Sequence, residues 1–554
     1  MIGLLSISRR QTLHQLGSAG AAALIASGYL AACSGIVVSQ PIDDDDALLA
    51  RLVAQKPSHI PRRDRPYRLV RPLILGEGVH LTIAPGTRFL WEGAAQSADG
   101  GPAFAFNAVG DNVTIAVPSG QEATVESPHP NPKLYAVGMR GRRGLSVTGI
   151  QGIDCCHVFV GPLAAGYDDV RMVGTNSNTA RNIQIRGGGS RFKARAPDGD
   201  GACYLAYVEN CEVDGAQYEN MMHGVQWWGG DANFSRDGEF TNERKCRSIV
   251  IRNVTVRNVT GGIWGSMGRD VVVQDCLVEN CSDVGFDAEG STNVLFERCV
   301  SINARNGCFA TFFYCDGVRF VDCEGRVDDK DFALMRVYNA SQDSVKNRQL
   351  EIRGGKFWCT DQTGPSSIDT TSGPVREFTM TGAKLSNVRV DTAHMNMHRT
   401  VICDNQITFP YTLPPGAAIR AGSSKVQTVS GVRAPGTVVI ERNHIVYHGL
   451  SRASTATIAI EVIEDDYNSS AIDRIVDNTV SGSFAVAISL INASKNAGVI
   501  PSFTIERNRF VRLAPSAKVL NVVSKGGALK PPAVLWDDTQ ARDGRTINLS
   551  RAQS

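Results

Sequence analysis

The feature that most constrains the fold of this chain is a short pattern that recurs along most of its length. Each copy alternates apolar and polar residues and ends in a small, thiol or amide residue. From Val254 to Cys323, successive copies end 22, 23 and 24 residues apart. A fixed period of this size indicates a solenoid, because each unit is too short to bury its own apolar face and must stack on its neighbours. The copies are Val208–Cys211, Ile251–Val254, Val273–Cys276, Phe296–Cys299, Phe320–Cys323, Ile352–Gly355, Ile402–Asn405, Ile440–Asn443, Ile475–Asn478 and Ile505–Asn508.

The units of this solenoid are strands, because the alternation has period two and Val, Ile and Phe fill the apolar positions. The fixed leucines of leucine-rich repeats and the longer apolar stripes of helical repeats are absent. Over about residues 79–511 the chain resembles the right-handed parallel β-helix of the pectate-lyase-like superfamily. The resemblance implies an all-β, single-stranded right-handed parallel β-helix and carbohydrate activity in general.

The last residues of the repeats predict stacked columns inside the coil. One column would hold Cys211, Cys276, Cys299 and Cys323, and would continue as Asn405, Asn443, Asn478 and Asn508. Stacked amides form hydrogen-bonded ladders, and stacked thiols pack as small apolar groups. We expect this column to stabilise the fold rather than to carry chemistry.

The N-terminus is typical of an exported lipoprotein. Ser8–Leu13 resembles a twin-arginine motif, with Thr12 where Phe is usual, and Leu30–Cys33 resembles a lipobox. This resemblance implies lipidation of Cys33 and a membrane contact through that lipid. Ser34 favours the outer membrane, facing the periplasm or the exterior; an ordinary cleaved signal is the alternative.

The chain organisation follows from these signals. We expect an export segment (1–32), a lipidated N-terminus with a short acid-led helix and a linker (33–66), the β-helix (67–515), and a C-terminal cap or tail (516–554). Of the 14 cysteines, all except Cys33 should be mostly free and buried, because twin-arginine substrates fold in a reducing compartment. The net charge of +2 and the lack of basic runs with interleaved aromatics argue against nucleic acid as a partner.

A second strand of the coil carries residues that suggest chemistry. We align its copies on a glycine, as Gly224–Trp228, Gly262–Ser266, Gly285–Glu289 and Gly307–Thr311. Side chains alternate between the two faces of a strand, so one set points into the coil and the other outward. The outward set would include Gln226, Trp228, Trp264, Asp287, Glu289 and Phe309.

This outward set suggests a groove for a polysaccharide. Exposed aromatic residues usually mark a contact surface, and sugar rings stack on aromatic faces. We expect the substrate to be bound by Gln226, Trp228, Trp264, Phe309 and Asp283, and Lys330, Arg336 and Tyr338 could extend the groove. A loop could instead cover these aromatics, and residues 229–247 form a long polar insertion beside them.

Asp287 and Glu289 form the sharpest candidate catalytic pair. Residues two apart on a strand point the same way, with Cα atoms ~6.6 Å apart. Two carboxylates at such a separation can act as acid and base in glycoside hydrolysis. The alternatives are a Ca²⁺ site, because that cation prefers oxygen ligands, or plain solvated acids. Apart from this possible Ca²⁺, the sequence suggests no cofactor and no structural metal.

Two further residues complete the candidate catalytic set. His223 could act as a general acid or base near neutral pH, or could be a surface or turn residue. Arg305 could bind the carboxylate of an acidic sugar, or could pair with Asp283 or Asp287.

The sequence leaves three classes of function open. The first is an enzyme that cleaves glycosidic bonds, with hydrolysis favoured slightly over a lyase reaction by the paired acids. The second is a lipid-anchored binding or structural module without turnover. The third is an epimerase acting on polymerised uronates.

Overall fold

The computed structural model describes most of the chain from residue 44 onward. The described ranges are 44–97, 101–118, 120–162, 179–196, 199–230, 232, 246–313, 315–338, 347–372, 375–393, 399–411, 413–422, 437–449, 457–464, 472–492, 502–513, 517–524, 534–536, 541–542 and 545–546. The export motif, the predicted lipidation site Cys33 and most of the 229–247 insertion lie outside these ranges, so they stay predictions.

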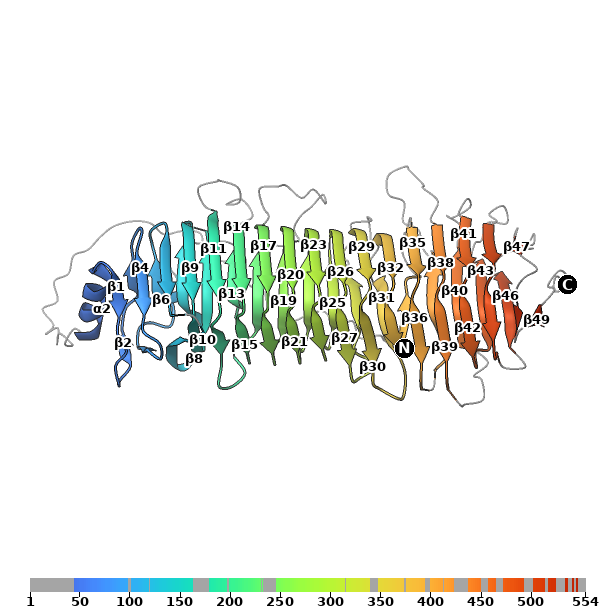
Figure 1. Ribbon diagram of the computed structural model, residues 1–554, viewed down its shortest axis with the longest axis horizontal. Helices are drawn as coiled ribbons and strands as arrows, with labels where there is room; N and C mark the ends of the chain where they lie inside the picture. Colours follow the sequence, from blue (N-terminus) through green and yellow to red (C-terminus); the bar gives the residue numbers. More distant parts are fainter. Residues whose placement is uncertain are drawn as a thin grey trace, which may run out of the picture. The chain divides into compact units, whose positions relative to one another are not determined.

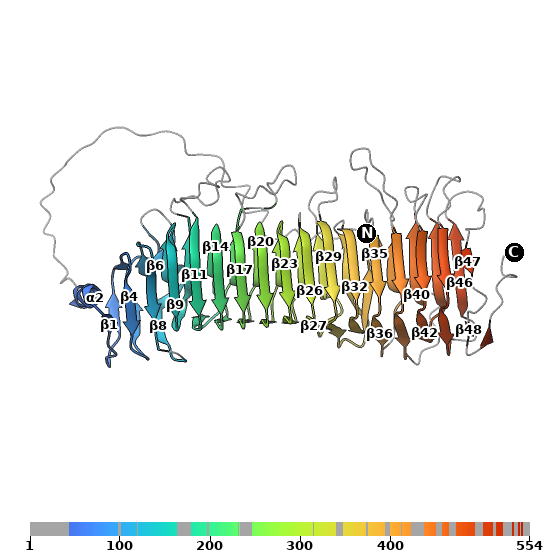
Figure 2. The same cartoon turned by 45° about the horizontal axis from the view of Figure 1, so that its top comes forward.

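The described chain forms the predicted parallel β-helix, with three strands in each coil. Each strand pairs with the equivalent strand of the next coil, as in β14–β17–β20, and the coils follow one another from the blue to the red end of Figure 1. Strands stack in parallel register because period-two segments of equal length repeat along the chain. Figure 2 shows first-ladder strands such as β14, β17 and β20 side by side, with β27 and β36 of the second ladder below them.

Among the described residues the first ladder holds 17 parallel strands. They are β1 (Ser58–Ile60), β4 (His80–Ile83), β7 (Val113–Ala116), β9 (Arg143–Thr148), β11 (Ala180–Arg186), β14 (Val208–Asp214), β17 (Cys246–Arg252), β20 (Gly268–Gln274), β23 (Thr292–Glu297), β26 (Asp316–Val321), β29 (Asn347–Arg353), β32 (Val375–Thr381), β35 (Arg399–Cys403), β38 (Thr437–Glu441), β41 (Ile472–Val476), β44 (Ser502–Glu506) and β47 (Val534–Trp536).

The second ladder follows a tight turn after each first-ladder strand. It contains β2 (Tyr67–Leu69), β5 (Arg88–Trp91), the first parts of β8 (Ala123–Arg140) and β10 (Ile150–Gly161), β12 (Gly189–Arg191), β15 (Gln217–Glu219), β18 (Thr255–Arg257), β21 (Leu277–Glu279), β24 (Val300–Ile302), β27 (Glu324–Val327), β30 (Lys356–Cys359), β33 (Lys384–Ser386), β36 (Gln406–Phe409), β39 (His444–Tyr447), β42 (Thr479–Gly482), β45 (Arg509–Val511) and β48 (Ala541–Arg542), which pairs antiparallel with β49 (Arg545–Thr546).

The third ladder closes each coil and carries the candidate site. It contains β3 (Leu73–Leu75), β6 (Ala103–Ala108), the last parts of β8 and β10, β13 (Gly201–Ala206), β16 (His223–Trp228), β19 (Gly261–Ser266), β22 (Val284–Glu289), β25 (Gly307–Phe312), β28 (Met335–Tyr338), β31 (Ser366–Ser372), β34 (Val388–Asp391), β37 (Gly416–Gly422), β40 (Thr457–Glu464), β43 (Val486–Asn492) and β46 (Lys518–Ser524).

Helix α2 (Asp44–Ala54) packs against the first three strands through Leu49 and Val53. The helix lies where the acidic run of the sequence predicts one. It shields the first strands of the solenoid, whose edge would otherwise be left unpaired. Asp45 is buried and accepts hydrogen bonds from Arg63 and Arg65. Burial acts to raise the pKa of Asp45, but these arginines and the Arg68 amide outweigh it and lower the pKa to about 2. No helix among the described residues has both the length and the apolar character needed to cross a bilayer.

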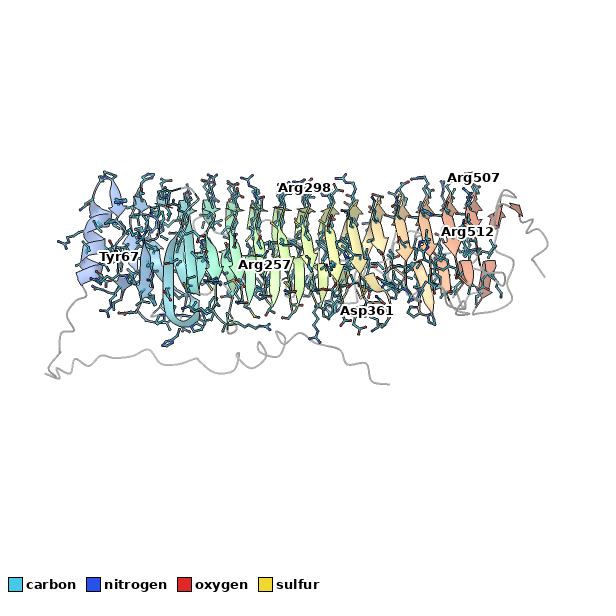
Figure 3. The ribbon with its side chains drawn as sticks, turned by 60° about the horizontal axis from the view of Figure 1, so that its bottom comes forward. Tyr67, Arg257, Arg298, Asp361, Arg507 and Arg512 are labelled. Carbon is cyan, nitrogen blue, oxygen red and sulfur yellow. The ribbon has the colours of Figure 1, made fainter. Side chains whose placement is uncertain are left out.

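The turn between the first and second ladders is built from residues in the left-handed region. Asp275, Arg298, Asp477 and Arg507 all adopt positive φ there. Arg298 donates hydrogen bonds to Asp275 at 2.8 Å, and Arg507 to Asp477 at 2.8 Å. Arg298 and Arg507 project from the same edge of the solenoid (Figure 3). Surface pairs of this kind contribute little each, so we regard them as aligning successive turns rather than holding the fold together.

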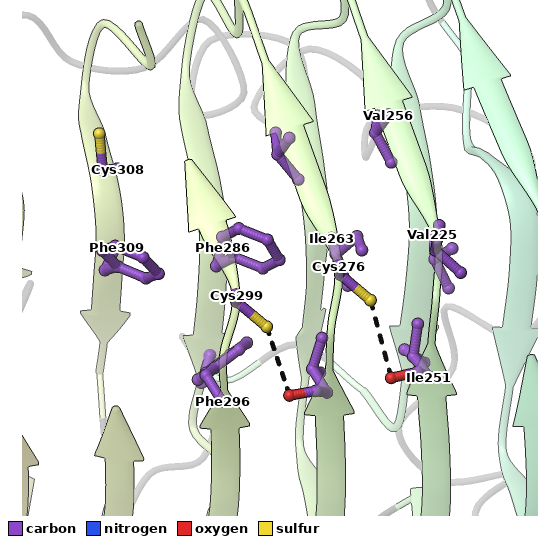
Figure 4. Packing of buried hydrophobic residues seen from close by; sticks show 14 of the residues in the cluster. Val225, Ile251, Val256, Ile263, Cys276, Phe286, Phe296, Cys299, Cys308 and Phe309 are labelled. Carbon is purple, nitrogen blue, oxygen red and sulfur yellow. Dashed lines mark hydrogen bonds between the residues drawn. The ribbon is translucent and has the colours of Figure 1, made fainter. Parts of the chain in front are cut away.

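The interior contains the predicted column, with one correction. Cys276 donates to Ile251 O and Cys299 to Val273 O, at 3.8 and 3.4 Å (Figure 4). Cys211 was predicted wrongly for this column. Val213 pairs with Ile251, so Ala216 lies opposite Val254, whereas Cys211 pairs with Ile249 inside the first ladder. The sequence match at residues 208–211 is displaced by five residues from the structural repeat.

The thiol column continues as an amide ladder, as predicted. Asn405 Nδ2 donates to Asn443 Oδ1 at 2.9 Å, and Asn443 and Asn478 each donate to the next Oδ1 at 3.0 Å, ending at Asn508. All cysteines from Cys155 to Cys403 are buried and free, which confirms the expectation for the described part of the chain.

Candidate functional site

The candidate acids lie on the outer face of β22. Phe286 and Ala288 are fully buried in the interior, so the alternating residues Asp287 and Glu289 point outward. In register with them, β19 contributes Trp264 beside Asp287 and Ser266 beside Glu289. One coil earlier, β16 contributes Gln226 and Trp228 at the same two positions. The outer face therefore brings the aromatic and acidic side chains of three successive coils together.

The fourth coil departs from the predicted alignment, and Phe309 was assigned wrongly. Gly307 pairs with Val284 rather than with Gly285, so Phe309 lies opposite Phe286 and enters the core. The two rings stack with centroids 5.5 Å apart, and Phe309 is fully buried (Figure 4). The glycine used to align this coil is one residue out of phase, and a shift of one residue exchanges the two faces of a strand.

The true outward positions of β25 are Ala310, opposite Asp287, and Phe312, opposite Glu289. Phe312 is half-buried and packs against Tyr338 of β28, with ring centroids 5.9 Å apart. Sequence reasoning missed Phe312, because only the strand register reveals that it faces outward. The aromatic surface predicted for Phe309 is thus provided by Phe312 and Tyr338, on the side of Glu289 away from Trp228.

The outward residues are more covered than an open groove would leave them. Trp264 is 3% exposed, Gln226 5% and Asp287 6%, whereas Trp228 and Glu289 are half-buried. The rings of Trp228 and Trp264 meet edge to face at 6.3 Å. The prediction of an exposed aromatic stripe is therefore wrong for Trp264, which is buried and whose ring contacts those of Trp228 and His223. What reaches solvent is a narrower surface beside Trp228 and Glu289.

The position of His223 on this face depends on the glycine opposite it on β19. His223 begins β16 opposite Gly261, and a Cβ at position 261 would lie 2.6 Å from His223 Nδ1. The imidazole is buried against Trp264, with ring centroids 5.3 Å apart. The absence of a side chain at Gly261 thus leaves room for the imidazole in the position that it occupies here. Gln226, by contrast, is held by the backbone, since its Oε1 accepts from Gly201 N at 3.0 Å.

The structure separates Arg305 from the acids with which the sequence could pair it. Arg305 is exposed in the turn before β25 and forms no ion pair with any described residue. Asp283 instead accepts a hydrogen bond from Asn306 Nδ2 at 2.9 Å, and Asn306 Oδ1 accepts from Arg336 at 2.5 Å. This series of hydrogen bonds from Arg336 through Asn306 to Asp283 was not predicted, because no sequence motif singles out Asn306.

Arg336 is the cation nearest in register to the acid pair. It occupies the position of Asp287 two strands later, with Ala310 between them. Two ladder steps correspond to a Cα separation of ~10 Å. The intervening residues are small, since Ala310 has only a methyl group and Gly307 has no side chain to fill the space beside Arg336. The face thus presents aromatic rings, then two carboxylates, then a guanidinium.

Metal ligation was the alternative for the acid pair. Within the described ranges no group of three or more His, Cys, Asp or Glu side chains is arranged to hold a metal ion. The carboxylates of Asp287 and Glu289 alone provide two side chains of the oxygen type that Ca²⁺ prefers. Ca²⁺ at this position therefore stays a prediction.

Solved structures with a similar course of the chain include several that act on or bind glycans. The A-module of mannuronan C-5 epimerase AlgE4 from Azotobacter vinelandii is 13% identical, covering 81% of this chain and 91% of its own, with a TM-score of 0.32. The catalytic domain of a GH87 α-1,3-glucanase is 10% identical, covering 86% and 71%, with a TM-score of 0.33. A tailspike protein mutant of E. coli bacteriophage HK620, in complex with a pentasaccharide, is 10% identical, covering 82% and 73%, with a TM-score of 0.44. At these identities and TM-scores they carry no information about activity.

No curated protein sequence is significantly similar to this chain. The family described as "Right handed beta helix region" matches residues 170–325, which include β16, β19, β22 and β25. The segment that carries the candidate site is thus similar in sequence to the right-handed β-helix region, in agreement with the fold.

Proposed function

We propose that this protein cleaves glycosidic bonds in an extracellular or envelope polysaccharide, by hydrolysis. The observation that carries the proposal is the pair Asp287 and Glu289, two carboxylates on one outer face of β22. Glycoside hydrolysis uses two carboxyl groups that flank the scissile bond, one to protonate the leaving oxygen and one to activate water or attack the sugar. Their Cα atoms are ~6.6 Å apart along the strand, and flexible side chains can adjust the distance between the carboxyl groups.

The two acids have different surroundings, which suggests a division of roles. Glu289 is half-buried, so it has the access to solvent that a base activating a water molecule needs. Asp287 is nearly buried beside Trp264, and we assign it the proton donor. His223 contacts the ring of Trp264 edge to face, so we assign it the role of positioning that ring.

The flanking residues support a sugar chain as substrate. Trp228 on one side of Glu289 and Phe312 with Tyr338 on the other are half-buried or exposed aromatic side chains. The C–H edges of sugar rings pack well on such surfaces. Arg336 replaces Arg305 as the candidate partner for a sugar carboxylate, because a guanidinium binds a carboxylate through two parallel hydrogen bonds. An acidic polysaccharide fits this arrangement best.

The test is product analysis by mass spectrometry after incubation with acidic and neutral polysaccharides. Wild type should release fragments that each carry one added water. Asp287→Asn and Glu289→Gln should each lower the rate at least ~100-fold, as expected for loss of a general acid or base. Glu279→Gln, in the same coil but on the second ladder, is the matched control and should keep full activity.

Other outcomes would overturn hydrolysis in distinct ways. Fragments with an unsaturated end and no added water would establish a lyase. Unchanged chain length with altered uronate stereochemistry would establish an epimerase. Glycan binding without any product, equal in wild type and both variants, would establish a binding module.

The cellular location is part of the same proposal. A polysaccharide outside the cytoplasm requires an exported enzyme, and the twin-arginine and lipobox resemblances would supply export and a lipid anchor at Cys33. Cys33→Ser should release the protein from the membrane fraction. Retention of this variant in that fraction would contradict the anchor.

A further inference from the structure

A cavity lies at the N-terminal end of the third ladder, away from the acid pair. It has a volume of about 560 Å³, within the range of small-ligand pockets. Its walls come from the turn between β2 and β3, from β5 and the loop after it, from β6, and from the end of β8. Asn107 in its wall occupies the outward column that leads, six ladder steps later, to Asp287.

The lining of this cavity is cationic. It contains Arg71, Arg140 and Arg142, and none of the described residues that line it is acidic. Arg71 is partly neutralised by Asp46 at 3.4 Å. In the described part of the chain, neither Arg140 nor Arg142 forms an ion pair. Two guanidinium groups without carboxylate partners therefore face one cavity.

The position of Arg140 is fixed by aromatic rings. Its guanidinium lies 5.7 Å from the centroid of Phe104 and 5.5 Å from that of Phe159. Arginine held over aromatic faces keeps its charge and its forked donors in a defined orientation. A ligand anion would therefore meet a positioned donor set rather than a mobile surface side chain.

Most of the remaining lining residues are apolar, and Gln96, Ser97 and Asn107 add three neutral polar side chains. Trp91 and Phe104 contribute aromatic side chains, and Val70 and Val109 at the cavity are 42% and 41% exposed. Exposed apolar surface beside a cavity favours a ligand that also has an apolar face. A small inorganic anion would pair with the arginines but would make no contact with the apolar walls. A neutral ring would pack on the apolar walls but would leave the charges of the arginines uncompensated.

We propose that this cavity is a binding site for a carboxylated sugar residue. The carboxylate would pair with Arg140 and Arg142, and the C–H face of the ring would lie against Trp91 and Phe104. The proposal rests on the proposed function only in taking a saccharide as the ligand. Six ladder steps place the cavity ~29 Å from Asp287 on the same outer face. It would thus anchor an acidic polysaccharide at a distance from the point of cleavage.

The experiment measures binding of a saturated uronic acid trimer, and of its carboxyl-reduced counterpart, to the full chain by calorimetry. Hydrogen exchange of residues 103–108 locates the site, because β6 forms its wall. Wild type should bind the uronate trimer, with slower exchange in β6, and should bind the reduced trimer at least tenfold more weakly. The double variant Arg140→Gln/Arg142→Gln should weaken trimer binding at least tenfold, because it removes the charged donors that pair with the carboxylate, and it should abolish the change in β6.

Two controls separate this site from the proposed catalysis. Arg143→Gln removes a neighbouring exposed arginine that does not line the cavity, and it should bind as wild type does. Asp287→Asn/Glu289→Gln should also leave exchange protection in β6 unchanged, so loss of turnover and loss of this site are independent results. Equal trimer binding and equal protection of β6 in wild type and the double arginine variant would overturn the proposal, as would preference for the reduced trimer.

Discussion

The asparagine ladder in the C-terminal half offers a strong test of how the coils are held in register. Asn443 lies at the middle of the ladder and is almost fully buried. Its Oδ1 accepts hydrogen bonds from the backbone N and Nδ2 of Asn405, at 3.1 and 2.9 Å, and its Nδ2 donates to Ile402 O at 2.8 Å. Its Nδ2 also donates to Asn478 Oδ1 at 3.0 Å, so Asn443→Ala removes four hydrogen bonds at once, and no water can replace them without entering the interior.

The magnitude follows from those contacts. The Asn405 N–H would be left buried without an acceptor, which costs about 1–3 kcal/mol, and the three other partner groups would each lose a bond worth about 0.5–1.5 kcal/mol. The free energy of unfolding should therefore fall by roughly 2.5–7.5 kcal/mol. Urea unfolding followed by circular dichroism measures this fall, and hydrogen exchange should show lost protection at Asn405.

Two variants provide the comparison. Gln406→Ala, exposed on the neighbouring β36, should change stability by less than about 0.5 kcal/mol. Cys323→Ala, in the same column, should cost about 1 kcal/mol, because a thiol is only a weak donor. If Asn443→Ala unfolds at the same urea concentration as wild type, and Asn405 keeps its protection, the ladder does not hold the coils together and the reasoning fails.

Two further predictions concern buried groups elsewhere. Burial raises the pKa of Asp473 to about 6, against hydrogen bonds with Glu464 and the Val438 amide that lower it. The folded state therefore binds this proton more tightly than the unfolded chain, and stability should fall by about 3 kcal/mol as the pH rises from about 4 to 6. Asp473→Asn should remove that dependence in urea titrations across this range; an unchanged slope would contradict it. Phe309→Ala should cost about 3–5 kcal/mol as a core truncation, whereas Phe312→Ala should cost much less. Equal losses in thermal unfolding would contradict the register that places Phe309 inside and Phe312 outside.

The sequence was sufficient to predict the architecture. Period-two apolar positions repeating about every 23 residues allow few folds other than stacked strands, and the amide column from Asn405 to Asn508 followed from the same repeat. Asp287 and Glu289 were found because two residues in one strand need no knowledge of neighbouring coils to be placed on one face.

The alignment of residues in one coil with those in the next could not be predicted from the sequence pattern. Cys211 was displaced by five residues and Phe309 by one, because turns of different length interrupt the repeat and the glycines are not in equivalent positions. A slip of one residue exchanges inside and outside, so the sequence pattern alone placed Phe309 in the outward column of Asp287, where Ala310 lies.

The sequence by itself thus determined that this chain is a β-helix and that one strand carries paired acids on a single face, because both follow from local periodicity. Only the tertiary structure decided which residues of other coils lie beside them. It placed Arg336 rather than Arg305 in the column of Asp287, covered Trp264, and gathered Arg140, Arg142 and Phe104 around one cavity. The physical reason is that lateral neighbours in a solenoid are set by the register of the hydrogen-bonded ladders, which depends on the length and conformation of every intervening turn.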